Sequence, residues 1–179
     1  MSSSLLPAYK GKEPTNGAIM TVRALRQVES GFLADMLYEA IFIPEGHGPL
    51  PKAVIQDPSL SRYIENWGKD KLDIAWVAEA DHQLVGAVWG RLFNQEHKGF
   101  GYVDDRTPEL SMAVVAEYRN QGIGTRLMKS IASEYLKLGV EYLSLSVDKA
   151  NPAVNLYQRL GYTVAGETAT SLTMRKRLK

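Results

Sequence analysis

The feature that most constrains the fold is a junction at residues 108–125, P-E-L-S-M-A-V-V-A-E-Y-R-N-Q-G-I-G-T, where a strand pattern changes into a helix pattern. Leu110, Met112 and Val114 alternate with smaller residues, as in a half-buried strand, and from Gln121 onward the apolar spacing becomes helical. The first N–H groups of a helix have no partner inside it and carry the positive end of its dipole. Glycines at that point let a phosphate approach the bare backbone, so the junction predicts a pyrophosphate-binding turn.

The spacing of the glycines disfavours two common phosphate-binding loops. A P-loop requires G-x-x-x-x-G-K-[ST], but a threonine and an arginine follow the glycines here. A dinucleotide-binding turn requires a third glycine three residues after the second, and Leu127 stands at that position. The pattern that remains is R-x-x-G-x-G, formed by Arg119, Gly122 and Gly124.

This pattern resembles the signature [Q/R]-x-x-G-x-[G/A] of the GNAT superfamily, the acetyl-CoA-dependent N-acyltransferases. A second segment, Y-L-S-L-S-V-D-K-A-N-P-A-V-N-L-Y-Q-R-L-G-Y at residues 142–162, is similar to the family's second motif: a strand, an asparagine and a short helix that carries L-Y and ends in G-[F/Y]. Asn151 and Pro152 start this helix, and Gly161 ends it. The resemblance runs from about Ala18 to the C-terminus. The alternative is an ordinary strand–helix–strand–helix unit with glycine caps.

The rest of the chain predicts one domain over residues 18–179, preceded by a flexible leader or expression remnant at 1–17. The strand before the glycine turn and the strand at 142–148 are joined through a helix, so they should be parallel neighbours. Further strands are expected at 18–25, 74–80, 84–93, 162–167 and 170–177, and further helices at about 33–41 and 59–67. The sequence therefore predicts an α+β, three-layer α/β/α fold with a mixed, mostly antiparallel sheet of about seven strands and helices on both faces, which is also the GNAT order.

Composition limits the classes of function. Lys plus Arg number 21 and Asp plus Glu number 20, so charge does not favour nucleic acid or an anionic membrane as a partner. The absence of cysteine excludes a disulfide, a thiolate metal site and a cysteine nucleophile. His47, His82 and His97 lack metal-ligand spacing, so no metal is expected. Neither a membrane-length apolar run nor a signal-peptide layout is present, which favours a cytoplasmic enzyme.

The resemblance implies acetyl-CoA as co-substrate, with a different segment binding each part of it. Backbone groups of Met112 and Val114 would pair with the pantetheine arm as with an added strand, and the Met112 N–H would polarise the thioester oxygen. Asn151 is equally suited to being only the helix N-cap. The residues implied to bind the cofactor are Met112, Val114, Arg119, Asn120, Gln121, Gly122, Ile123, Gly124, Thr125, Asn151 and Asn155.

Tyr157 is the first candidate catalytic residue, because it occupies the L-Y position from which the family donates a hydrogen bond or proton to the leaving sulfur. A tyrosine with a pKa near ~10 is a weaker acid than a thiol near ~8.5, so proton transfer is favourable only after thiolate charge has formed. We therefore expect a late general acid and thiolate stabiliser. The alternative is a packed helix aromatic.

Glu109, at the entry of the signature strand, is the leading candidate for the base that deprotonates the amine. Many relatives carry an acidic residue about one position away, and a shift of one residue reverses the face of a strand. The alternative is a solvated glutamate at the end of a strand. Glu39 on the first helix is the second candidate, with surface pairing at i, i+4 as its alternative.

We expect an N-acetyltransferase that transfers an acetyl group from acetyl-CoA to the primary amine of a small molecule, by direct attack in a ternary complex. The alternatives are a protein or peptide N-acetyltransferase and a non-catalytic acyl-CoA-binding module, and a homodimer is left open. The Pro- and Gly-rich loop at residues 42–58 should form part of the acceptor pocket. Aromatic and acidic residues that would suit a cationic amine are Tyr38, Phe42, Trp67, Tyr102, Asp104 and Asp105.

Overall fold

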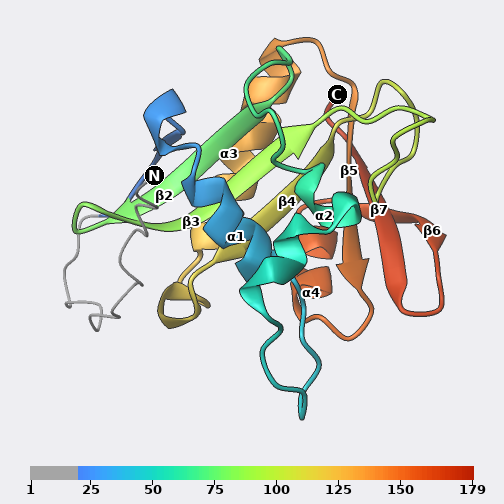
Figure 1. Ribbon diagram of the computed structural model, residues 1–179. Helices are drawn as coiled ribbons and strands as arrows, with labels where there is room; N and C mark the ends of the chain where they lie inside the picture. Colours follow the sequence, from blue (N-terminus) through green and yellow to red (C-terminus); the bar gives the residue numbers. More distant parts are fainter. Residues whose placement is uncertain (1–19) are drawn as a thin grey trace.

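The structure, a computed structural model, describes residues 20–179 and contains one seven-stranded sheet (Figure 1). The predicted leader over residues 1–17 lies outside the described residues. The strand order is β1-β2-β3-β4-β5-β7-β6, and only β4 and β5 are parallel neighbours, as predicted from the crossover. The strands are β1 (Met20–Ala24), β2 (Ile74–Ala80), β3 (Gln83–Arg91), β4 (Glu109–Val114), β5 (Tyr142–Asp148), β6 (Thr163–Glu167) and β7 (Ser171–Arg177).

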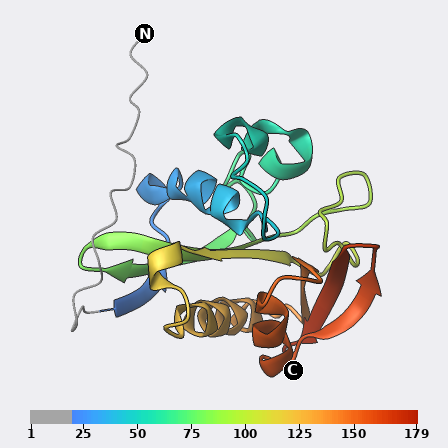
Figure 2. The ribbon, with the colours of Figure 1, turned by 90° about the horizontal axis from the view of Figure 1, so that it is seen from below.

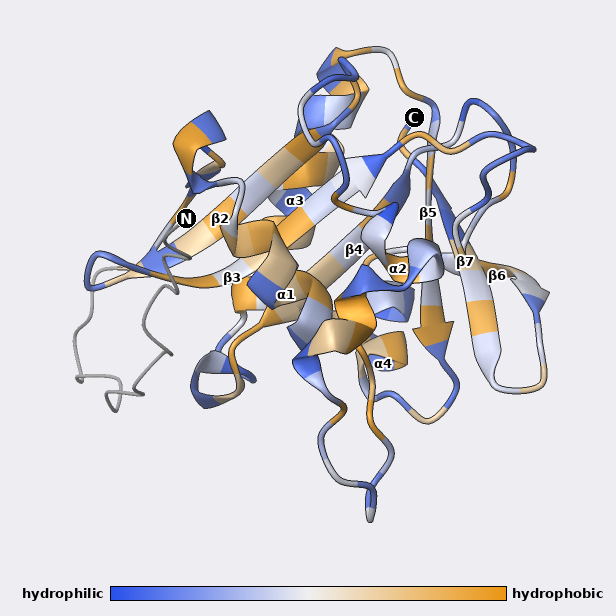
Figure 3. Ribbon diagram, in the orientation of Figure 1, coloured by the Kyte–Doolittle hydropathy of each residue, from blue (hydrophilic) through white to orange (hydrophobic). Residues whose placement is uncertain are grey.

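Helices cover both faces of this sheet (Figure 2). They are α1 (Phe32–Ala40), α2 (Pro58–Ser61), α3 (Ile123–Lys137) and α4 (Ala153–Arg159), with short 3-10 helices at Gln27–Glu29, Lys52–Gln56 and Ala116–Tyr118. One apolar cluster packs α1 against the sheet, and the other packs α3 and α4 against the opposite face. Hydrophobic residues accordingly concentrate on the strands and on α1 (Figure 3). The predicted three-layer α+β fold is confirmed.

The helix predicted over residues 59–67 is shorter in the structure. Only Pro58–Ser61 forms an α-helix, which begins where the Asp57 side chain accepts a hydrogen bond from the Ser59 N–H. The following turns are closed by bonds three residues apart, such as Tyr63 N–H to Leu60 O. Asn66 then adopts a left-handed φ of 53°. This tighter winding directs the Tyr63 side chain toward the start of β4.

The two parallel strands are hydrogen-bonded only where they begin. Their paired residues are Glu109 with Ser144 and Leu110 with Leu145, and β4 and β5 diverge beyond them (Figure 1). In contrast, β3 and β4 stay paired along the whole of β4. The second half of β4 therefore has no strand partner on its β5 side.

Candidate active site

The predicted pyrophosphate turn lies at the start of α3. Asn120 and Gly122 have positive φ values of 61° and 77°, and α3 begins at Ile123. Within the described chain, no hydrogen bond is made by the backbone N–H groups of residues 120–125. Such a turn at a helix N-terminus presents a row of free donors and the positive end of the helix dipole. Its chemistry fits the pyrophosphate of coenzyme A.

Gly124 allows the start of α3 to pack closely on β4 and α4. A Cβ at this position would lie 3.2 Å from Cδ2 of Leu156 and 3.3 Å from Cε of Met112. A larger residue would push the turn away from the end of β4. The two glycines therefore have different tasks, because Gly122 provides the left-handed backbone and Gly124 the close approach.

The Arg119 side chain is engaged within the protein. Its Nε donates to the Val114 carbonyl oxygen at 2.8 Å, and its Nη2 lies 3.2 Å from Oε2 of Glu39 on α1. Both partners of the ion pair are partly exposed, so the ion pair contributes little stability. Arg119 nevertheless ties the turn to the end of β4 and to α1. Glu39 is ion-paired there, which weakens its candidacy as the base.

The second half of β4 has backbone N–H groups on the side from which β5 diverges. Val115 N–H donates to Val85 O on the β3 side at 2.9 Å, while Ser144 N–H of β5 donates to Pro108 O at 3.0 Å. Because backbone groups alternate along a strand, the amides of Met112 and Val114 lie on the same side as Pro108 O. They are available to an extended ligand between β4 and β5, in line with the geometry that a pantetheine arm requires.

Asn151 lies between the end of β5 and the start of α4, and Asn155 and Tyr157 lie on α4. The Asn151 side-chain oxygen accepts from the N–H of Ala153, the first residue of α4, at 2.9 Å, and Asn155 is exposed. The Tyr157 side chain is only 7% exposed, and its ring packs edge-on against Tyr162 with centroids 6.0 Å apart. Burial raises the pKa of Tyr157 to about 12. At neutral pH its hydroxyl is protonated and able to donate a hydrogen bond.

Glu109 lies beneath the loop that joins β3 to β4, on the face covered by α1 and α2. Its residue is 3% exposed, so the alternative of a solvated glutamate is wrong. Oε1 accepts hydrogen bonds from the Tyr63 hydroxyl at 2.6 Å and from the Gly101 N–H at 2.8 Å. Burial raises the pKa of Glu109 to about 7, although these two hydrogen bonds oppose the shift. A carboxyl that titrates near neutral pH suits general acid–base chemistry.

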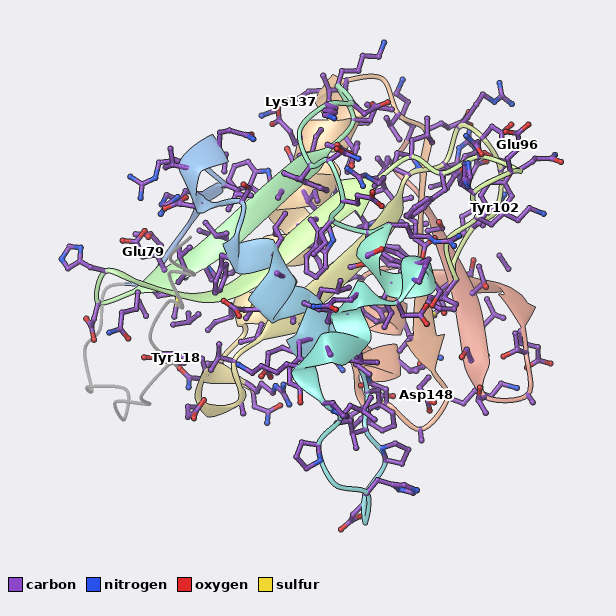
Figure 4. All side chains as sticks on the ribbon, in the orientation of Figure 1. Glu79, Glu96, Tyr102, Tyr118, Lys137 and Asp148 are labelled. Carbon is purple, nitrogen blue, oxygen red and sulfur yellow. The ribbon has the colours of Figure 1, made fainter. Side chains whose placement is uncertain are left out.

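The residues expected to attract a cationic amine are largely paired with other protein groups. Tyr102, on the loop between β3 and β4 (Figure 4), donates to Asp105 at 2.5 Å. The Asp104 carboxylate accepts from the Arg106 N–H at 2.9 Å, closing the same loop. Arg91 stacks 5.3 Å from the centre of the Trp67 ring. These contacts give Trp67, Tyr102 and the two aspartates structural roles.

Sequence reasoning missed Tyr63, Gly99 and Gly101, which surround the Glu109 carboxyl. The signal that could have found the glycines is G-F-G at residues 99–101, shortly before the signature strand, because glycine in a loop often marks a close approach. Tyr63 lies just after a short helix, in a segment whose apolar residues have no regular spacing, so no sequence pattern indicated it. Among residues 20–179, no group of His, Asp and Glu side chains is placed to hold a metal ion, and no helix is long and apolar enough to cross a membrane.

Comparison with known proteins assigns the family. The model of the acetyltransferase (GNAT) family matches residues 38–162, so the chain belongs to the GNAT family. The predicted family is therefore confirmed.

Two curated relatives match part of the chain. An uncharacterized N-acetyltransferase of Methanocaldococcus jannaschii is 34% identical over 89 residues, which are 49% of this chain and 51% of the relative. An N-alpha-acetyltransferase of Sulfurisphaera tokodaii is 36% identical over 98 residues, covering 49% of this chain and 54% of the relative. The chain therefore spans about half the length of these relatives.

Solved structures share the fold at low identity. A putative acetyltransferase from Acinetobacter baylyi has a TM-score of 0.66 at 16% identity, covering 90% of this chain and 93% of the other. The PaiA N-acetyltransferase of Thermoplasma acidophilum, solved with coenzyme A, has a TM-score of 0.64 at 19% identity, covering 89% and 99%. A putative acetyltransferase of Salmonella typhimurium, solved with acetyl-CoA, has a TM-score of 0.60 at 17% identity, covering 89% and 94%. These likenesses support the fold assignment.

Proposed function

We propose that the protein is an N-acetyltransferase that transfers an acetyl group from acetyl-CoA to the primary amine of a small molecule, by direct attack in a ternary complex. The observation that carries this proposal is that β4 has a candidate phosphate-binding turn beyond one end and a candidate base at the other. Free N–H groups of the turn at 120–125 lie beyond one end of the strand, and a buried carboxyl that titrates near neutral pH lies at the other. Between the carboxyl and the turn, β4 is no longer paired with β5, so the backbone of β4 is free along this stretch.

Bound acetyl-CoA would supply an activated thioester, and the chain would bind, orient and move protons. The amides of residues 120–125 receive the pyrophosphate, with Arg119 holding the turn against β4. Met112 and Val114 align the pantetheine arm, and the Met112 N–H is directed at the thioester oxygen. Asn151 retains its side-chain N–H groups for the cofactor while its oxygen accepts from the Ala153 N–H, and the exposed Asn155 lies on α4.

In this mechanism, Glu109 takes a proton from the acceptor ammonium and leaves a neutral amine with a free lone pair. That amine attacks the thioester carbonyl, the C–N bond forms and the C–S bond breaks. The nitrogen gives up its second proton as the amide forms, and this proton passes through water to the thiolate that leaves. Tyr157 donates a hydrogen bond to the departing sulfur. With its pKa raised to about 12, Tyr157 is a poorer acid than a thiol near ~8.5, so we assign it stabilisation of the thiolate rather than complete proton transfer.

A peptide N-terminus is the second candidate acceptor, because a relative that is 36% identical over 98 residues is named N-alpha-acetyltransferase. Both candidates present a primary amine to the same site. A non-catalytic acyl-CoA-binding module would not need a buried carboxyl with a pKa near 7 at the end of the strand. A cytoplasmic location and a homodimer stay predictions from the sequence.

A panel of acceptors tests the proposal. Free thiol released from acetyl-CoA would be measured with amino acid amides, polyamines, aminoglycosides and short peptides with free N-termini. We expect turnover with small amines. Turnover only with peptides would replace the proposal by the second candidate. Acetyl-CoA binding without turnover on any acceptor, with identical behaviour of Glu109→Gln, would favour the non-catalytic module.

A further inference from the structure

The carboxyl of Glu109 is held through one oxygen only. Oε1 accepts from the Tyr63 hydroxyl at 2.6 Å and from the Gly101 N–H at 2.8 Å. Oε2 is buried and, within residues 20–179, has no hydrogen-bond partner. Because the lone pairs of Oε1 are already used by two donors, Oε2 is the oxygen on which an incoming proton is best accepted.

Gly99 is the residue that lets Oε2 lie where it does. A Cβ at position 99 would stand 2.1 Å from Oε2 and 2.7 Å from the Tyr63 hydroxyl oxygen. Any other residue would displace the carboxyl, the hydroxyl or the loop. The backbone of the loop therefore closes directly over Glu109.

The orientation of the Tyr63 hydroxyl is fixed by its surroundings. Its oxygen accepts from the Phe100 N–H at 2.6 Å, so its single proton is left to point to Glu109. The ring meets Phe93 edge-on with centroids 5.0 Å apart and stacks on Phe100 at 6.2 Å. Tyr63 is 5% exposed, whereas Phe100 is 59% exposed. The Tyr63 hydroxyl is thus a donor with a fixed orientation, and the exposed ring of Phe100 stacks on the Tyr63 ring.

Other polar groups without partners lie on the same face of the sheet. Ser144 is the paired residue of Glu109 on β5, and its buried Oγ makes no hydrogen bond in the described chain. The same holds for Trp89 Nε1, whose residue is paired with Ser111, two positions along β4 from Glu109. Buried polar groups without protein partners commonly mark a position for water or ligand. Because the loop closes over Oε2, a proton from the acceptor reaches this oxygen through water rather than by direct contact with the nitrogen.

We propose that Tyr63 is a positioning residue for acetyl transfer: it holds Oε1 of Glu109 so that Oε2, which Gly99 covers, receives the proton of the acceptor amine through water. The inference rests on the proposed function. An N–H bond of the acceptor ammonium breaks, an O–H bond forms at Oε2, and the lone pair stays on nitrogen. The neutral carboxyl later returns the proton to solvent.

The hydrogen bond also has an electrostatic consequence. It stabilises the carboxylate and lowers the Glu109 pKa against the upward effect of burial. Replacing the hydroxyl by hydrogen should therefore raise this pKa. The base would then be protonated over a wider range of pH, so turnover near neutral pH should fall even if acetyl-CoA binds normally.

Tyr63→Phe tests this directly because it keeps the ring between Phe93 and Phe100. The Glu109 pKa would be measured by carboxyl NMR on protein labelled with ¹³C-glutamate, and Glu109→Gln identifies the signal. We expect the pKa to rise by roughly 1, the acidic limb of the kcat/KM profile to move upward equally, and the acetyl-CoA Kd to stay within about twofold. Tyr142→Phe, half-buried on β5 beside Arg175, is the matched control and should leave the profile unchanged.

An unchanged Glu109 pKa in folded Tyr63→Phe would overturn the inference, and so would an unchanged pH profile. If Tyr63→Phe does not fold, Gly99→Ala provides the second test, with Gly31→Ala as control because a Cβ at 31 meets nothing within 4 Å. Gly99→Ala should lose turnover and keep acetyl-CoA binding, and full turnover would contradict the inference. Failure of the wild type to acetylate any amine would instead overturn the proposed function, while the NMR comparison would still decide whether Tyr63 holds the carboxyl.

Discussion

Glu109 and Ser144 face each other at the start of β4 and β5, where the two strands are hydrogen-bonded before they separate. The proposed base therefore stands at the closed end of the separation, and the free amides of the glycine turn lie beyond its open end. One strand, β4, positions both. This arrangement links the two halves of the proposed reaction.

Replacing Glu109 by glutamine should abolish most of the activity without affecting the cofactor. The change removes the base, a loss of about 10²–10⁴-fold in kcat/KM for a positioned general base. The Kd for acetyl-CoA should stay unchanged, because the carboxyl lies on the α1 and α2 face. Thiol release and calorimetry on the same preparation would measure both, and activity within twofold of wild type would remove Glu109 from the mechanism.

The same substitution should change the stability profile with pH. The Glu109 pKa is raised from 4.5 to about 7 in the folded protein, so the folded state holds this proton more tightly than the unfolded state. Its contribution to stability is present below pH 4.5 and is lost as the pH rises through about 7. As the pH rises from 4.5 to about 7, the Tm of Glu109→Gln should therefore increase relative to that of the wild type. A constant difference in Tm across that range would contradict the raised pKa.

An α-amine should be a better acceptor than an alkylamine at neutral pH. A base with a pKa of about 7 takes a proton from an α-ammonium near ~8 at a cost of ~1.4 kcal/mol, but from an alkylammonium near ~10.4 at ~4.6 kcal/mol. Glycinamide should therefore give a higher kcat/KM than propylamine at pH 7.5, and the gap should narrow as the pH rises. A preference for propylamine at pH 7.5 would mean that Glu109 does not receive the acceptor's proton.

Tyr157→Phe should separate binding from turnover. The phenyl ring can keep its packing against Tyr162, while the hydrogen bond to the departing sulfur is lost. We expect a decrease of about 10–100-fold in kcat with an unchanged acetyl-CoA Kd, in line with the loss of one hydrogen bond to a charged group. Steady-state kinetics would measure it. Unchanged turnover would leave Tyr157 as a packed aromatic only.

Gly122→Ala should weaken acetyl-CoA binding through the backbone. At φ 77° an alanine costs about 1–2 kcal/mol and deforms the turn. Gly139 provides the matched control, because it has a φ of 80°, open space at its Cβ position and a place beyond the other end of α3. Both variants should lose similar stability in thermal unfolding, and only Gly122→Ala should raise the Kd in calorimetry. Equal affinities would place the pyrophosphate elsewhere.

The sequence predicted the part of the site that depends on local patterns. The strand, the glycine turn and α3 follow from periodicity and helix-start chemistry, and the parallel pairing of β4 and β5 follows from the crossover. The position of β7 between β5 and β6 was not predicted, because a hairpin can dock on a sheet through either strand. Tyr63 and Gly99 were missed because loops from different parts of the chain bring them to Glu109, and no local pattern encodes that contact.

The proposed reaction requires that the wild-type protein bind acetyl-CoA along β4 and at the glycine turn. Calorimetric titration with acetyl-CoA, desulfo-CoA and ATP isolates the contribution of the pantetheine arm. All three ligands contain a phosphorylated adenosine, but ATP lacks the arm. We expect micromolar affinity for acetyl-CoA and desulfo-CoA and much weaker binding of ATP, because the arm pairs with β4. Failure of acetyl-CoA to bind, or binding no tighter than ATP, would contradict this expectation.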